Sequence, residues 1–281
     1  QCNKGIPEEI SSLSVTFKSF DLESLKSLFD EYPGQIACVI TEPEKNFDGD
    51  TYEFLREAIK LSHENGALFI IDEMITGFKT ALPGSMTKFR LEADMATWGK
   101  STANGFSFCA LTGKRRVMEL GSIDKPGMEK VFLISTTHGG ETHSIGAALA
   151  TIKFYKEHKV IEKNHRIGQR VIEECTARLK KFDLADLIVL SSTPWMVAFG
   201  FKNSTGEDDA GYRTLFLQEM IKNGVLFQGV FVPCFSHNEE EVQFFIKAFE
   251  NACLVYKKAL QSSYQEYLIG TPTKPVFRRI L

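Results

Sequence analysis

Short apolar runs alternate with helix-like segments over the first hundred residues. Apolar runs occupy 36–40 and 67–71, and residues 51–65 between them repeat apolar positions at helical spacing before Gly66. A short apolar run bounded by turn residues predicts a buried strand, and glycine is common at the C-terminal end of a helix. The order strand, helix, strand is a βαβ unit, which implies a parallel sheet.

The same patterns continue along the rest of the chain. Apolar residues from Leu22 to Phe29 lie at helical spacing, and Pro33-Gly34 ends that helix. Further strands are expected at 95–98, 108–112, 131–135, 187–190 and 196–201, and further helices at 114–120, 145–152, 161–182, 211–222 and 239–260. Beyond residue 182, strand-like runs alternate with turns, and the last two helices flank a loop at 224–237, so this part is predicted to be α+β.

The composition is that of an ordinary globular protein of one or two domains. Of the 281 residues, 43% are hydrophobic and 25% charged, and the net charge of −3 gives no reason to expect nucleic acid or an acidic membrane as a partner. No apolar run approaches the ~20 residues of a membrane span, and residues 1–10 do not form a signal peptide. The cysteines form no CxxC pair and the histidines lack metal-ligand spacing, so we expect reduced thiols, no metal site and a cytoplasmic location.

An acid and a lysine each follow a predicted strand. Asp72 comes directly after the run 67–71, and Lys100 follows the run 95–98 and Gly99. The carboxyl ends of parallel strands are where open α/β sheets bind ligands, so both side chains could face one crevice. The alternative is a chance pair in a chain with 33 Lys+Arg and 36 Asp+Glu, with the lysine solvated in a loop.

The residues around this pair resemble those of a known enzyme family. The runs IIDEMITGFK and WGKSTANGFSFCALTGKR, with Lys100 lying 28 residues after Asp72, resemble the class III aminotransferases, which depend on pyridoxal 5′-phosphate (PLP). The resemblance is to the branch that contains glutamate-1-semialdehyde aminomutase and its sugar-pathway relatives, and it extends from about Gly5 to Arg279.

The resemblance implies an α/β fold of the fold type I PLP-dependent transferases. It assigns 1–157 to part of the PLP-binding large domain, a mainly parallel sheet with flanking helices, and 158–281 to the small C-terminal α+β domain. Residues 1–35 resemble neither the family's loop that cups the cofactor phosphate nor its aromatic residue that stacks on the ring. The chain is therefore expected to correspond to the C-terminal two-thirds of such an enzyme, with an incomplete large domain.

The resemblance also implies the roles of three residues. Lys100 would form a Schiff base with the cofactor aldehyde and then serve as a general base. Asp72 would pair with the protonated pyridine nitrogen, and that proton keeps the ring electron-withdrawing. Met74 stands where the family usually has a branched aliphatic residue, and its pliable side chain can still contact the ring.

A fourth residue, Thr137, precedes a helix rich in small residues. A hydroxyl and free N–H groups at a helix start can bind an anion, although N-capping is the simpler interpretation. The resemblance implies that Thr137, with Gly140 three residues later, contacts the phosphate of the neighbouring subunit's cofactor, so a homodimer with shared active sites is expected. Glu141-Thr142 departs from the Asn-Pro that is more usual there.

The implied function is transfer of an amino group from a small-molecule donor to a carbonyl acceptor. One alternative is a glutamate-1-semialdehyde 2,1-aminomutase, which moves the group within one molecule, and another is a catalytically silent fragment of such an enzyme. The segment 224–237 is shorter than in those aminomutases and lacks the Phe-Glu pair of their active-site gate. This difference favours an aminotransferase acting on another carbonyl, such as a sugar-derived one, but it names neither donor nor acceptor.

Overall fold

The computed structural model describes residues 4–43, 49–124, 126–127, 129, 137 and 139–274. The chain divides into two compact units, one formed by Ser14–Ile161 and the other by Gln1–Leu13 with Glu162–Leu281. The strand predicted at 131–135 lies outside the described residues. The domain boundary predicted at 157–158 stays a prediction. Among the described helices, none has a stretch long and apolar enough to cross a membrane.

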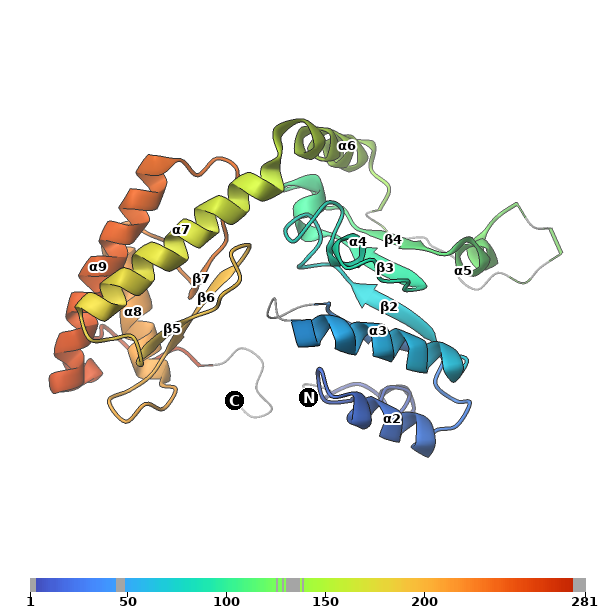
Figure 1. Cartoon of the computed structure of the whole chain (residues 1–281), viewed down its shortest axis with the longest axis horizontal. Coiled ribbons are helices and arrows are strands. Elements are labelled where there is room, and N and C mark those ends of the chain that lie inside the picture. The colour runs from blue at the N-terminus through green and yellow to red at the C-terminus, as the bar shows by residue number, and fades with distance from the viewer. Residues whose placement is uncertain are drawn as a thin grey trace. The chain divides into compact units, whose positions relative to one another are not determined.

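The unit Ser14–Ile161 contains a four-stranded sheet in the order β1-β2-β3-β4 (Figure 1). The strands are β1 Cys38–Thr41, β2 Leu68–Asp72, β3 Met95–Trp98 and β4 Ala110–Gly113. β1 pairs with β2 and β2 with β3 in parallel, whereas β4 runs antiparallel to β3. The predicted mainly parallel sheet is confirmed.

The three longer helices of this unit lie where helices are predicted, at 22–29, 51–65 and 145–152, whereas the short helices at 85–88 and 100–103 are not predicted. The longer ones are α2 Leu22–Glu31, α3 Gly49–Glu64 and α6 Thr142–His158, and the short ones are α4 Ser85–Lys88, α5 Arg115–Met118, η1 Lys100–Ala103 and η2 Glu119–Gly121. Figure 1 shows α3 lying along β2. Alternate residues of β2, Phe69 and Ile71, are fully buried in one core with α2 and α3. Ala96 and Trp98 of β3 belong to a second cluster, with Ile152 of α6 packed against it.

The second unit is built around a smaller antiparallel sheet. Its order is β5-β6-β7, with β5 Ile188–Leu190, β6 Val197–Phe201 and β7 Val230–Phe231, and its helices are α1 Glu8–Ser11, α7 Val160–Lys181, α8 Ala210–Lys222, α9 Glu239–Gln261 and η3 Tyr264–Glu266. Its core is rich in aromatic side chains, among which Phe216, Phe249 and Tyr256 are fully buried. β7 lies within 224–237, which is predicted as a loop. The sequence does not reveal this strand because two residues are too few to give an alternating pattern.

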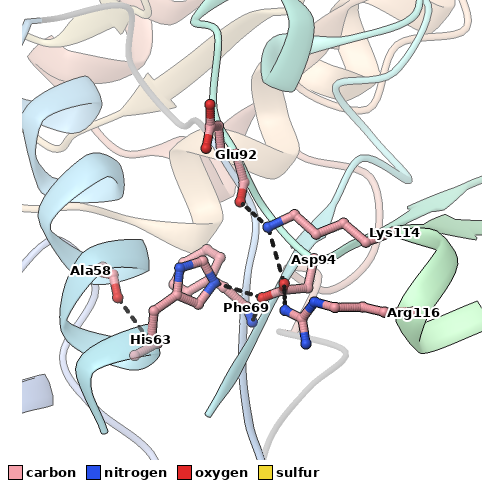
Figure 2. Close-up of polar contacts among 8 residues, drawn as sticks. Ala58, His63, Phe69, Glu92, Asp94, Lys114 and Arg116 are labelled. Atoms are coloured by element: carbon pink, nitrogen blue, oxygen red, sulfur yellow. Dashed lines mark hydrogen bonds and ion pairs between the residues drawn. The ribbon is translucent and has the colours of Figure 1, made fainter. Parts of the chain in front are cut away.

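A buried carboxylate, Asp94, joins β2, β3, α3 and the segment after β4 (Figure 2). Its Oδ2 accepts hydrogen bonds from Phe69 N–H at 2.9 Å and from His63 Nε2 at 2.7 Å. Its Oδ1 accepts from Lys114 Nζ at 3.1 Å and from Arg116 Nη2 at 2.6 Å. The backbone N–H of Asp94 also donates to Phe69 O at 2.8 Å. Because a buried charge is costly unless it is paired, this cluster holds the amino-terminal ends of β2 and β3 together.

The cluster makes the anionic form of Asp94 the stable one. Burial raises the pKa of Asp94, but hydrogen bonds from Phe69 N–H, His63 and Lys114 outweigh it and lower the pKa from 3.8 to about 2. A carboxyl group whose pKa falls on folding stabilises the native state above its unfolded pKa. That contribution is lost as the pH falls from about 4 to about 2.

We predict that Asp94→Asn lowers the free energy of unfolding at pH 7 by about 2–3 kcal/mol. The substitution keeps the shape and removes the charge, and hydrogen bonds to a charged group contribute ~1.5–3 kcal/mol, partly screened here because the cations reach solvent. Urea unfolding should show the gap between parent and variant shrinking between pH 4 and pH 2, where the parent's own Asp94 takes up its proton. Glu92→Gln, on an exposed neighbour, is the control. A gap that stays constant from pH 7 to pH 2 would show that charge is not the cause.

Candidate active site

Asp72 and Thr97 lie opposite each other at the carboxyl ends of β2 and β3. They are partners in the parallel register, and both are half-buried. The Oδ1 atom of Asp72 accepts a hydrogen bond from Thr97 Oγ1 at 2.9 Å and one from Met74 N–H at 2.9 Å. The acid that follows the β2 core is therefore held at the edge of the sheet, where α/β proteins bind ligands.

Lys100 begins η1, directly after β3 and Gly99. It is exposed, and its φ of 48° is in the left-handed region, which is uncommon for a residue other than glycine and is often found at functional sites. Gly99 packs against Met74 so closely that a Cβ atom there would lie 2.4 Å from Met74 Cε. The structure thus brings Asp72, Met74 and the backbone of Lys100 to the same edge of the sheet.

The turn that follows Asp72 is fixed by the buried carboxylate of Glu73. Its Oε2 accepts from Thr76 Oγ1 at 2.5 Å and its Oε1 from Met86 N–H at 2.6 Å, while Glu73 N–H donates to Thr97 O at 3.1 Å. Gly84 packs against the same carboxylate, since a Cβ atom there would lie 2.5 Å from Glu73 Cδ. Sequence reasoning missed this anchor. The Asp-Glu pair after an apolar run was a signal for it, but nothing local says which acid turns inward.

A second amine, Lys79, lies in this turn. Its Nζ donates to Ile75 O at 2.8 Å, and the side chain is half-buried. Burial, followed by the positive charge of Lys100, lowers the pKa of Lys79 from 10.5 to about 8. The turn after Asp72 therefore brings a second positive group into the electrostatic neighbourhood of Lys100, a feature that the sequence pattern did not predict.

Thr137, the fourth predicted site residue, lies apart in the sequence from the other three. It lies exposed in a bend ahead of α6, whose N-cap is Glu141, and residues 130–136 and 138 are outside the described ranges. The structure does not bring Thr137 together with Asp72, Met74 and Lys100. Its role stays a prediction. Within the described residues, no group of three His, Cys, Asp or Glu side chains is placed to hold a metal ion.

Asp72, at the end of β2, and Lys100, after β3, lie at the carboxyl edge of the sheet, which is where α/β proteins bind ligands. The sequence pattern of the family described as "Aminotransferase class-III" matches residues 7–253. The chain belongs to the class III aminotransferase family, as the resemblance of its motifs implied.

Relatives with assigned activities include both mutases and transferases. The chain is 28% identical over 265 residues to a glutamate-1-semialdehyde 2,1-aminomutase of Thermosipho africanus, covering 88% of this chain and 60% of that protein. It is 26% identical over 274 residues to a 3-aminobutyryl-CoA aminotransferase of Cloacimonas acidaminovorans, covering 91% of this chain and 61% of that protein. The chain thus spans about three-fifths of the length of these relatives.

Solved structures of transaminases share the fold. The PLP-containing FumI protein of Sphingopyxis sp. MTA144 superposes with a TM-score of 0.77 at 21% identity, covering 89% of this chain and 59% of that one. An omega-transaminase from Sphaerobacter thermophilus gives a TM-score of 0.78 at 16% identity, covering 90% and 60%. At such identities the likeness establishes the fold of these transaminases, fold type I, for the chain.

We predict that Gly84→Ala destabilises the unit Ser14–Ile161 through Glu73. The backbone of Gly84 is extended, so the substitution adds no backbone strain, but the new methyl group would displace a buried, hydrogen-bonded carboxylate. Overpacking of this kind costs about 1–3 kcal/mol, which urea unfolding measures. Gly121→Ala is the matched control, because a Cβ atom there meets no other atom within 4 Å. Equal stability of the two variants would contradict the anchoring role of Glu73.

Proposed function

We propose that this chain binds PLP and takes part in the transfer of an amino group from a small-molecule donor to a carbonyl acceptor. The observation that carries the proposal is the register of β2 with β3, in which Asp72 faces Thr97 and Lys100 follows on the same strand end. A lysine amine and a carboxylate are the two groups that PLP chemistry requires from a protein. Membership of the class III family supports the assignment.

The donor set at this edge fits the cofactor. When bound, PLP supplies an electron sink that stabilises negative charge on the substrate carbon. Lys100 would hold the cofactor through its amine, and once released it would move a proton to and from that carbon. Asp72 would keep the proton on the ring nitrogen, because a negative charge beside a protonated nitrogen favours its charged form. Met74, wedged against Gly99, would contact the ring.

An aminomutase is the second candidate, because glutamate-1-semialdehyde 2,1-aminomutases are among the relatives. The two functions share the acid and the lysine, and they differ in whether an external amino donor is required. An assay with and without added donor separates them. The catalytically silent chain named as an alternative from the sequence stays a prediction. The cytoplasmic location predicted from the sequence also stays a prediction.

We predict that Lys100 is the residue that holds the cofactor. Adding PLP to the chain and reducing with borohydride should fix the label on the peptide that contains Lys100, and Lys100→Ala should remove the label from that peptide. Lys79 is the internal comparison, because its pKa of about 8 leaves part of its amine unprotonated near neutral pH and therefore reactive. Labelling of Lys79 in preference to Lys100, read by peptide mass spectrometry, would overturn the assignment.

We further propose a homodimer in which Thr137 binds the phosphate of the cofactor held by the other subunit. The proposal is supported by the position of this hydroxyl ahead of α6 and by the family resemblance of the Thr-x-x-Gly run. A site completed by a second chain exists only in the dimer, so cofactor binding and assembly are linked by mass action.

We predict that Thr137→Val weakens cofactor retention about tenfold or more while the fold of the subunit is unchanged. A hydrogen bond to a charged group contributes ~1.5–3 kcal/mol, and ~1.4 kcal/mol is tenfold in affinity. Dilution series that follow cofactor release together with sedimentation test this, with Thr137→Ser as the control that keeps the hydroxyl. If Thr137→Val holds its cofactor as well as the parent at every concentration, the two-chain site is wrong.

A further inference from the structure

Thr97 is tied to the loop that carries Asp72 and Glu73 by its side chain and its backbone. Its Oγ1 donates to Asp72 Oδ1 at 2.9 Å, and its carbonyl oxygen accepts from Glu73 N–H at 3.1 Å. The parallel pairing of β2 with β3 makes the two residues partners in register. These contacts fix both the backbone position and the side-chain rotamer of Thr97 at the end of the sheet.

The two donors to Asp72 converge on one oxygen. Met74 N–H and Thr97 Oγ1 both lie 2.9 Å from Oδ1. These two hydrogen bonds, one from the turn after β2 and one from β3, fix the torsion of the carboxyl group and hence the direction of the other oxygen, Oδ2. Precise orientation of a functional carboxylate by such supporting hydrogen bonds is a general requirement of binding sites.

We propose that Thr97 is a positioning residue for Asp72. With Met74 N–H, its hydroxyl holds Oδ1 so that Oδ2 is directed toward the protonated ring nitrogen of the cofactor. This inference rests on the proposed function. The competing explanation is that Thr97 is simply a β-branched residue suited to a strand, in which case its hydroxyl has no consequence for the cofactor.

The test compares Thr97→Val, Thr97→Ser and a matched variant on the adjacent strand, Thr112→Val. The first removes the hydroxyl and keeps the shape, and the second keeps the hydroxyl. The third removes a similar bond, in which Trp98 Nε1 donates to Thr112 Oγ1 at 2.8 Å, without touching Asp72. Each protein is loaded with PLP that carries ¹⁵N in its ring, and the ring-nitrogen NMR shift reports protonation directly.

We expect the ring-nitrogen signal to move toward its unprotonated position in Thr97→Val, as it should in Asp72→Asn, and to stay unchanged in Thr97→Ser and Thr112→Val. A parent-like signal in Thr97→Val, with Asp72→Asn shifted, would overturn the positioning role and leave the proposed function intact. Failure of the parent chain to bind PLP would instead overturn the proposed function and this inference with it. Should Thr97→Val not fold, Thr97→Ala replaces it.

A second readout needs no cofactor. If Thr97 holds the carboxyl group that accepts Met74 N–H, its loss should speed hydrogen exchange of the Met74 amide by about fivefold, the factor that corresponds to ~1 kcal/mol. Thr97→Ser and Thr112→Val should leave this exchange rate near that of the parent. Equal acceleration in Thr97→Val and Thr112→Val would mean that the sheet as a whole had loosened, and it would contradict a specific role for Thr97.

Discussion

The parallel pairing of β2 with β3 is the constraint on which the candidate site depends. Side chains alternate between the two faces of a sheet, so a slip of one residue would turn Asp72 away from its partner. The pairing is held near its start, where Asp94 binds Phe69 through side chain and backbone, and at its end, where Thr97 binds Asp72 and the Glu73 backbone. Since Lys100 follows β3, its backbone position is set by the same register.

Three carboxylates near this sheet differ in burial, and their partners differ accordingly. Asp94 is fully buried and is bonded to His63 and to two cationic side chains. Glu73 is equally buried and is bonded by a hydroxyl and a backbone N–H. Asp72 is only half-buried and uses one oxygen for its two donors. The two inner carboxylates are structural, and the one at the edge is the group that can meet a ligand.

The long helices and the strands other than β7 were predictable because their apolar patterns are local. Asp72 and Lys100 were predictable as a pair because each follows a strand-like run, and the family motif raised that expectation further. The Asp94 cluster was not predictable, because its partner His63 lies 31 residues away and nothing in either local pattern shows that the two meet. The hydrogen bond of Thr97 to Asp72 was not predictable for another reason. A threonine in a strand is expected for its β-branched shape, whether or not its hydroxyl makes a hydrogen bond.

The turn after Asp72 connects this carboxylate at the edge of the sheet with the buried carboxylate of Glu73. The buried carboxylate of Glu73 fixes this turn through its hydrogen bonds. The turn also contains Lys79, whose pKa is lowered to about 8 by burial and by the charge of Lys100. A lowered pKa means that the folded chain disfavours the charge on Lys79. Folding therefore becomes more favourable as the pH rises from about 8 toward 10.5, the ordinary pKa of a lysine amine. Any anion that binds beside the two amines would oppose this effect and raise the pKa of Lys79 again. The charge on Lys79 would therefore respond to an anion bound beside the two amines.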